Sequence, residues 1–329
     1  MASDRELKNR IKSIESIGQI TGAMKMVASS QIRKIEQLAL EGRAYADCIR
    51  RVVRSVFKHI NTFKHPILNT RPVEKIGVIV IGGDSGLCGS YNSNLARHAL
   101  KTIEKLPKKM TKLLCLGGKA VKALTKAGYK PETLSSYDPN APAKWEYKPE
   151  LADQIVKICA KWYYDSEVDE ILVVYTNAIT MLTCETRTFQ LFPLKALKQG
   201  RDLAIGEVND SASLGFDQLD IRKEIEDKEE KLYGDDDDDD ESIIDYIFEP
   251  DVEEVLEVIV KAYFRAVVMQ LLLESKTSEL GSRVKAMSNA TDNAKSLAEE
   301  LTMEYYRVRQ NGITTEIIEI SSGAEALKE

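Results

Sequence analysis

Apolar residues recur at alternating steps of four and three residues along both ends of this 329-residue chain. The first stripe runs from Leu7 to Ile60, and twelve of its sixteen positions are apolar. The second runs from Val252 to Val308, with fourteen apolar positions out of seventeen. A 3.5-residue repeat sustained over this length predicts left-handed coiled coils. Because the two stripes lie at opposite ends of one chain, we expect their helices to pair antiparallel.

The seam of the N-terminal stripe contains many small or polar residues, among them Gly18, Thr21, Ala28 and Gly42. Small side chains let two helices approach closely but bury little apolar area. A two-helix coil of this length with so weak a seam would be marginal alone. The pattern therefore predicts a partner that encloses the helices.

Between the stripes, the chain alternates between apolar strand patterns and amphipathic helix patterns. This alternation predicts a parallel or mixed sheet covered by helices, in a Rossmann-like α/β domain. The expected strands are 74–82, 111–116, 170–176 and 183–192, and the expected helices are 91–106, 119–127 and 151–164. The fold class is therefore α/β, with a coiled-coil helix over 1–62, an inserted α/β domain over 70–249 and a second coiled-coil helix over 250–329.

The glycine-rich turn after the first expected strand does not match a nucleotide-binding motif. Its glycines stand at 82, 83, 86 and 89, whereas a dinucleotide fingerprint needs the spacing G-x-G-x-x-G. The pair Gly118-Lys119 lacks the first glycine and the hydroxyl residue of a phosphate-cradling loop. Ser85 has no suitably placed His and Asp for protease chemistry. These patterns disfavour a dinucleotide-dependent enzyme and a protease, and we expect no catalytic residue, cofactor or metal.

Charge is distributed unevenly along the chain, whose net charge is −6. Residues 1–60 carry +6, whereas residues 198–257 carry −17 and include six consecutive aspartates, Asp235–Asp240. The stretch over about 198–242 is expected to be a solvated insertion, since its carboxylates lack the spacing of a calcium loop. The basic N-terminal helix could meet nucleic acid, an anionic membrane or an acidic protein surface, and its lack of interleaved aromatics disfavours nucleic acid.

Cysteine and histidine usage is sparse. Five widely spaced cysteines predict reduced thiols, and three histidines make a histidine-based metal site improbable. No run of about 18 apolar residues is present, so no transmembrane helix is expected. The first six residues contain no apolar signal core.

Several separated motifs resemble, in order, those of the gamma subunit family of F-type ATP synthases. They are residues 17–34, Gly86-Leu87-Cys88-Gly89 followed by Asn92, Tyr246–Asp251, the stretch from Ser278 to Ala294, and the stretch from Arg309 to Ile320. The resemblance covers the chain except for about 198–242. Ser85 and Gln31 depart from it, since the family usually has Arg at the first position and commonly Lys at the second.

The resemblance implies a central rotor shaft that performs no chemistry of its own. The two terminal helices would form an antiparallel coiled coil inside a ring of catalytic alpha and beta subunits. The α/β domain would lie against the epsilon subunit and the membrane ring of c subunits. Ion-driven rotation of the c ring would then couple to ATP synthesis or hydrolysis. The expected location is peripheral, on the cytoplasmic face of the bacterial inner membrane.

The resemblance also implies contact residues by their position. Contacts with the catalytic ring are expected at Met24, Lys25, Arg309, Gln310, Thr314 and Glu316, and contacts near the c ring and epsilon subunit at Tyr246, Phe248 and Glu249. Photosynthetic relatives carry a cysteine-pair redox segment about where the insertion lies, but 198–242 contains no cysteine, which rules out thiol regulation there. We hypothesise that the insertion acts through its charge. The alternative function is a coiled-coil scaffold protein without ATPase association.

Overall fold

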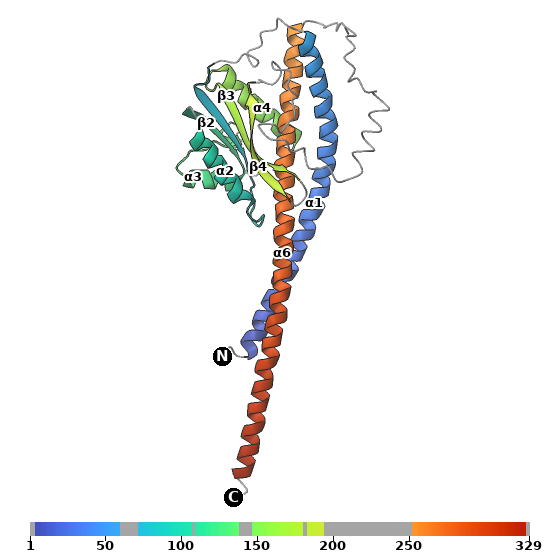
Figure 1. Cartoon of the computed structure of the whole chain (residues 1–329), viewed down its shortest axis with the longest axis vertical. Helices are drawn as coiled ribbons and strands as arrows, with labels where there is room; N and C mark the ends of the chain where they lie inside the picture. The colour runs from blue at the N-terminus through green and yellow to red at the C-terminus, as the bar shows by residue number, and fades with distance from the viewer. Residues whose placement is uncertain are drawn as a thin grey trace, which may run out of the picture. The chain divides into compact units, whose positions relative to one another are not determined.

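The computed structural model of this chain describes residues 4–59, 72–106, 109–137, 147–179, 183–193 and 252–326. The elements in chain order are α1 (Asp4–His59), β1 (Lys75–Ile81), α2 (Tyr91–Lys105), β2 (Lys109–Leu116), α3 (Gly118–Lys126), η2 (Leu134–Ser136), α4 (Pro149–Tyr164), β3 (Glu170–Ala178), β4 (Cys184–Phe192) and α6 (Val252–Ala326) (Figure 1). They form two compact units. We call Met1–Gln31 with Arg283–Glu329 the helix-pair unit, and Ile32–Ser282 the sheet unit.

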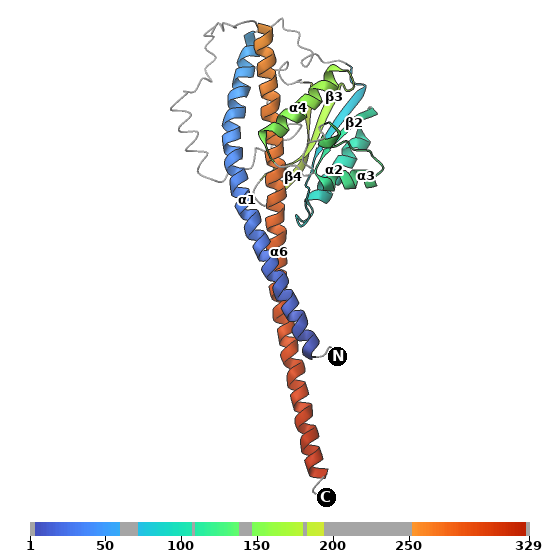
Figure 2. The same cartoon turned by 180° about the vertical axis from the view of Figure 1, so that it is seen from behind.

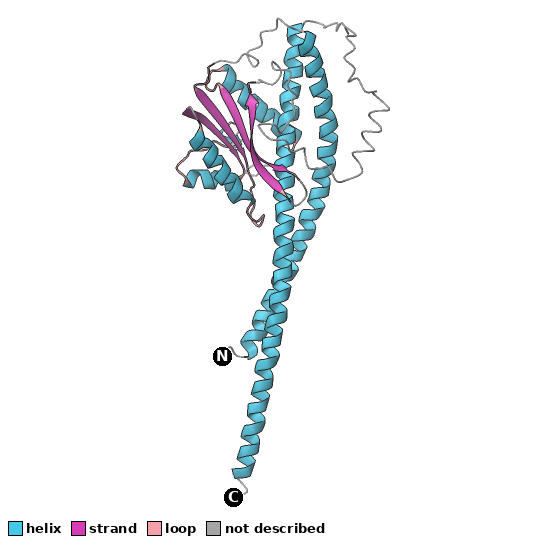
Figure 3. Ribbon diagram, in the orientation of Figure 1, coloured by secondary structure: helices cyan, strands magenta, loops and turns pink. Residues whose placement is uncertain are grey.

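The sheet unit contains one four-stranded sheet in the order β2-β1-β3-β4 (Figure 3). Strand β1 pairs parallel with β2 and β3, and β4 pairs antiparallel with β3. Parallel neighbours need a crossover, which α2 supplies between β1 and β2. Strand β4 follows β3 in the chain, and the Ile179 N–H at the end of β3 donates to the Thr183 carbonyl at 3.1 Å. The sheet is mixed, as the parallel-or-mixed prediction allowed.

Successive side chains of β1 enter two different cores, because neighbouring residues of a strand point to opposite faces. Ile76, Val78 and Val80 pack with α2 and α3. Ile79 and Ile81 pack with α4 and with the part of α6 in the same unit. Figure 2 shows α2 and α3 on one side of the sheet and α4 on the other. Covering both faces explains why β1 reads as a continuous apolar run.

Aromatic side chains join α6 to the sheet. Phe264 on α6 stacks on Phe192 at the end of β4, with ring centroids 4.2 Å apart and 6° between the planes. Tyr163 on α4 also packs against Phe192, with ring centroids 5.6 Å apart. All three rings are buried, so this contact anchors α6 within the sheet unit.

The expected elements between the stripes are present, and the differences fall at their ends. Strand β2 begins at Lys109 rather than at 111. The apolar pattern misses its first residues, because they alternate between exposed and half-buried and include lysines. Helix α4 begins at Pro149 rather than at 151, since the fixed φ of proline suits a first helical position. Strand β3 continues to Ala178, because its last polar residues, Thr176 and Asn177, are buried like the apolar ones before them.

Candidate functional site

Small and hydroxyl side chains hold α1 against α6 in the helix-pair unit. The hydroxyls of Thr21 and Thr291 share a hydrogen bond of 2.8 Å. Lys25 Nζ donates to Ser288 Oγ at 3.0 Å. As residue numbers increase along α1, the residues they contact on α6 decrease in number, so these two segments run antiparallel. Lys25 is tolerated on the seam because a hydroxyl, and not an apolar side chain, faces its ammonium group.

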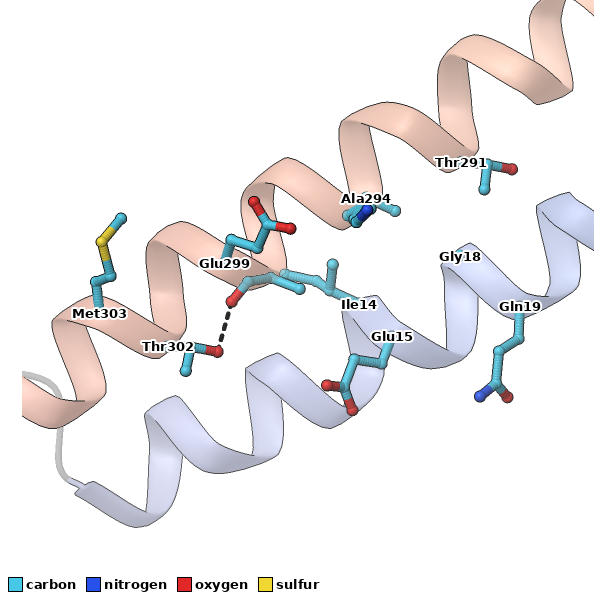
Figure 4. A pocket seen from close by; sticks show the side chains of 11 residues that line it. Ile14, Glu15, Gly18, Gln19, Thr291, Ala294, Glu299, Thr302 and Met303 are labelled. Atoms are coloured by element: carbon cyan, nitrogen blue, oxygen red, sulfur yellow. Dashed lines mark hydrogen bonds between the residues drawn. The ribbon is translucent and has the colours of Figure 1, made fainter.

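The seam buries little apolar surface. A Cβ added to Gly18 would lie 3.5 Å from the Ala294 Cβ, which is ordinary van der Waals contact. An open hollow between the helices begins here and continues past Ile14 towards Thr302, whose hydroxyl turns back to the Ala298 carbonyl at 2.7 Å (Figure 4). The small residues therefore bring the backbones close but leave the groove beside them unfilled.

Both helices of this unit expose large apolar side chains. They are Ile17, Ile20, Met26 and Val27 on α1, and Leu297, Met303, Tyr306, Ile313, Ile317, Ile318 and Ile320 on α6. Met26 is 71% exposed and Ile320 is 72% exposed. Exposed apolar side chains in such number mark a surface that meets another molecule.

The last turns of α6 are amphipathic. At about 100° per residue, Ile313, Ile317 and Ile320 fall within about 60° of one another around the helix. Thr315 and Glu319 fall on the opposite side, which they share with Ile318, about 60° from Thr315. All six side chains are exposed. The end of α6 therefore presents chemically different faces to its surroundings.

The residues predicted to contact a catalytic ring divide into two groups in the structure. Met24 and Lys25 are half-buried on α1. Arg309, Gln310, Thr314 and Glu316 are exposed on α6, where the Thr314 hydroxyl donates to the Gln310 carbonyl at 2.8 Å. The structure does not bring the two groups into one cluster: no hydrogen bond or ion pair between described residues joins them. The remaining predicted contacts, Tyr246, Phe248 and Glu249, lie outside the described residues, as does the acidic stretch 198–242.

In the sheet unit, buried polar groups fix α6 to the end of the sheet. The Tyr91 hydroxyl donates to the Ser275 carbonyl at 3.2 Å. The Ser278 hydroxyl donates to the Thr176 carbonyl at 3.0 Å. Glu279, which is 1% exposed, accepts a hydrogen bond from Lys276 Nζ at 3.0 Å. We call Tyr91, Thr176, Ser275, Ser278 and Glu279 the helix–sheet joint.

Gly83 makes room for this joint. A Cβ added there would lie 2.9 Å from Asn92 Oδ1 and 3.3 Å from the Glu279 carboxyl carbon. Burial, followed by the Glu279 carboxylate, raises the pKa of Tyr91 well above its ordinary value of 10.0. The Tyr91 hydroxyl therefore keeps its proton at neutral pH and remains a donor.

Sequence patterns alone do not reveal the joint. Tyr91 reads as the start of an amphipathic helix, and Ser275, Ser278 and Glu279 read as ordinary helix residues. A usable signal is the run of polar residues from Glu274 to Glu279, which interrupts the apolar stripe of α6 at the point where the stripe is otherwise strongest. All but Lys276 in this run are buried.

Among the described residues, no group of three or more His, Cys, Asp or Glu side chains is placed to hold a metal ion. No helix in the described part of the chain has a stretch long and apolar enough to cross a membrane.

Comparisons with known proteins agree with the motif order. A family described as ATP synthase matches residues 3–327. The ATP synthase gamma chain of Gloeobacter violaceus is 32% identical, covering 99% of this chain and all of that one. The ATP synthase gamma chain of Laribacter hongkongensis is 34% identical, with the same coverage of each.

Solved structures share the fold at lower identity. The rotor of the Euglena gracilis mitochondrial ATP synthase aligns with a TM-score of 0.56 and 16% identity, over 94% of this chain and 98% of that one. The central stalk and c ring of the Tetrahymena thermophila mitochondrial ATP synthase gives a TM-score of 0.51 and 20% identity, over 82% and 99%. From the full-length match to the family and to its curated members, the chain belongs to the ATP synthase gamma chain family.

Proposed function

We propose that this chain is the central-stalk rotor subunit of an F-type ATP synthase. It turns inside a ring of alpha and beta subunits and couples the ion-driven rotation of a membrane c ring to ATP synthesis or hydrolysis. The observation that carries this proposal is the helix-pair unit, in which the seam buries little while both helices expose many apolar side chains. The chain performs no chemistry itself, since catalysis belongs to the surrounding ring.

The stripes of both terminal helices support an antiparallel coiled coil as the shaft. The proposed organisation is a coiled-coil helix over 1–62, a Rossmann-like α/β domain over 70–249 with the acidic insertion, and a coiled-coil helix over 250–329. A ring that encloses the shaft would supply the apolar burial that the seam lacks. That is the physical reason for a long helix pair with so many small residues at its contact.

Rotation would act through the unequal faces of α6. As the shaft turns, a catalytic subunit meets first the side with Ile313, Ile317 and Ile320 and later the side with Thr315 and Glu319. A subunit with open and closed states is shifted towards whichever state makes the better contacts with the face presented. The torque thereby drives the three catalytic subunits through their states in sequence.

We assign the ring contacts to the residues placed by family position. Arg309, Gln310, Thr314 and Glu316 would form and break hydrogen bonds with beta-subunit loops once per step, and their exposure on α6 supports this role. Met24 and Lys25 would lie near the acidic lever segments of the beta subunits, towards which the +6 charge of residues 1–60 is favourable.

Tyr246, Phe248 and Glu249 are assigned to the foot, near the c ring and the epsilon subunit. In this account the chain is attached to the membrane only through the complex. Its proposed place is the cytoplasmic face of the bacterial plasma membrane, which the bacterial gamma chains among its relatives support.

The test is a native purification through a tag on this chain. The rotor account predicts that two homologous ATPase subunits co-purify in about threefold excess each, and that ATP hydrolysis requires the complex. Recovery of the chain alone, or with partners that do not hydrolyse ATP, would favour the coiled-coil scaffold.

A further inference from the structure

Helices α2 and α3 carry a surface rich in basic residues. Between positions 91 and 137 the sequence has ten Lys or Arg residues and only two Asp or Glu residues. The exposed basic side chains on the two helices are Arg97, Lys101, Lys105, Lys119, Lys122 and Lys126. We call these six residues the α2–α3 basic face.

The six charges are gathered rather than scattered. Arg97, Lys101 and Lys105 follow one another at four-residue steps, so they share one side of α2. Lys119, Lys122 and Lys126 are spaced by three and four residues and share one side of α3. Both helices cover the same face of the sheet and pack against each other (Figure 1).

Little on the described part of the sheet unit balances these charges. Like charges three or four positions apart destabilise a helix unless a counter-charge neutralises them. Glu104 is the single acidic residue within α2 and α3. None of the ion pairs between described residues involves the six side chains. The face is therefore suited to an anionic occupant.

The chain itself contains a segment of the required charge. Residues 198–257 carry −17, with the densest run at Asp235–Asp240 followed by Glu241. The described chain ends at Pro193, directly after β4, and resumes at Val252. The 42 positions from Pro193 to Asp235 can span up to about 140 Å, so chain length does not limit where the aspartates reach.

The exit point lies beside the basic face. Helix α2 contacts β4 directly: His98 Nε2 lies 3.0 Å from Thr188 Oγ1, and the Thr102 hydroxyl lies 3.3 Å from the same atom. Thr188 is only four residues before Phe192, where β4 ends. Lys101 precedes Thr102 in α2, so the chain leaves the sheet close to this end of the face.

We propose that the acidic segment Asp235–Glu241 docks on the α2–α3 basic face of the same chain. Since the contact is intramolecular, the tether keeps the acidic segment at a high effective concentration. Since both surfaces are solvated, the contact weakens as salt rises. The occupied face is then closed to any other acidic surface. This inference goes beyond the rotor function and does not depend on it.

The first test is zero-length carbodiimide cross-linking of the full-length chain, with peptide mapping of the monomer band. Cross-links from Asp235–Glu241 to Lys101 and Lys105 are expected at about 0.05 M salt, and their yield should fall at least about fivefold at about 0.5 M. Cross-links confined to the dimer band would assign the face to a second copy and overturn the proposal. So would equal yields to lysines on α4.

A charge-reversal pair tests the whole face. The variant Lys119→Glu with Lys122→Glu and Lys126→Glu leaves the acceptors on α2 in place, and should lower cross-links to Lys101 and Lys105 at least about fivefold. The matched control reverses three exposed lysines at α4, on the other side of the sheet: Lys148→Glu, Lys157→Glu and Lys161→Glu. It makes the same charge change and should keep the yield within about twofold. Equal losses in both variants would overturn the proposal.

A second measurement leaves the described fold untouched. Replacing the six residues Asp235–Asp240 by Asn removes their charge with little change of shape. Acetylation rates of Lys101, Lys105 and Lys119 in the native chain should then rise about threefold or more. Rates at Lys157 and Lys161 should not change. Unchanged rates on the α2–α3 basic face would contradict the proposal, as would cross-links from this face to another subunit in the assembled complex in place of its own segment.

Discussion

The hydroxyl of Tyr91 donates a hydrogen bond across 3.2 Å to the backbone carbonyl of Ser275, 184 residues later in the chain. It joins the start of α2 to the first third of α6, which begins at Val252. In the rotor account, force applied to the α/β domain reaches α6 through contacts of this kind. In that account the helix–sheet joint would transmit force as well as stabilise the fold.

Removing the Tyr91 hydroxyl should weaken the joint. We expect Tyr91→Phe to lower the free energy of unfolding by about 1 kcal/mol, the typical net contribution of one hydrogen bond. Chemical denaturation of the chain measures this. Tyr164→Phe is the matched control, because Tyr164 is 47% exposed and should change stability by under about 0.5 kcal/mol. Equal losses in both variants would contradict a special role for Tyr91.

Gly83 and Gly312 should respond oppositely to alanine. The Cβ of Gly83→Ala would lie 2.9 Å from Asn92 Oδ1, so we expect a loss of about 1–3 kcal/mol from overpacking. Gly312 lies in α6 with nothing within 4 Å of an added Cβ, so Gly312→Ala should stabilise the helix by up to about 1 kcal/mol. Thermal unfolding of the isolated chain separates the two. If Gly83→Ala left the thermal stability unchanged, the joint would have room for the added methyl group and the expected overpacking would be wrong.

The buried strands could be predicted from the sequence, whereas the strand ends and the helix–sheet joint could not. The apolar run over β1 predicts a strand buried on both faces. Residues 76–81 are all buried, and only Lys75 at the start of the strand is exposed. The start of β2 could not be predicted from an apolar strand pattern, because Lys109 and Lys112 place charged side chains in the first half of the strand. Tyr91 and Ser275 could not be paired from sequence, because no local periodicity records a contact between residues so far apart in the chain.

Arg309 and Arg307 test the assigned ring contacts. Both are exposed on α6, but only Arg309 falls on an assigned contact position. We expect Arg309→Ala to slow ATP hydrolysis by the complex about threefold to tenfold, because losing about 1 kcal/mol of contact formed in one state changes a rate by about fivefold. Arg307→Ala should remain within about twofold. If the two variants were equally active, the assignment of Arg309 would be wrong.

His98 should make stability depend on pH. Burial, followed by the charge of Lys101, lowers the pKa of His98 below its ordinary value of 6.5. The unfolded chain therefore binds this proton more readily, so the contribution is complete above about pH 6.5 and is lost as pH falls towards the lowered pKa. Denaturation at several pH values should show a steeper acid-side loss for the natural chain than for His98→Gln. Parallel curves would contradict this.

The reactivity of the cysteine thiols towards alkylation should follow their exposure. Burial raises the pKa of Cys115 to about 12 and that of Cys159 further still. Cys88 is also buried, whereas Cys48 and Cys184 are exposed. Alkylation of the native chain near pH 8, followed by mass spectrometry, should therefore modify only the two exposed thiols, since the thiolate is the reactive form. Labelling of Cys115 as fast as Cys184 would show that the sheet unit opens readily.

Tethering the shaft to the ring tests the central claim most directly. In a complex whose chain carries Cys48→Ser, Cys184→Ser and Thr314→Cys, a photoreactive maleimide on the new thiol can be cross-linked to the surrounding subunits by light. The rotor account predicts that labelled but unirradiated complexes hydrolyse ATP, and that activity falls in proportion to the fraction of this chain cross-linked to the ring. Full hydrolysis by complexes in which the chain is covalently fixed to the ring would contradict rotation of this chain.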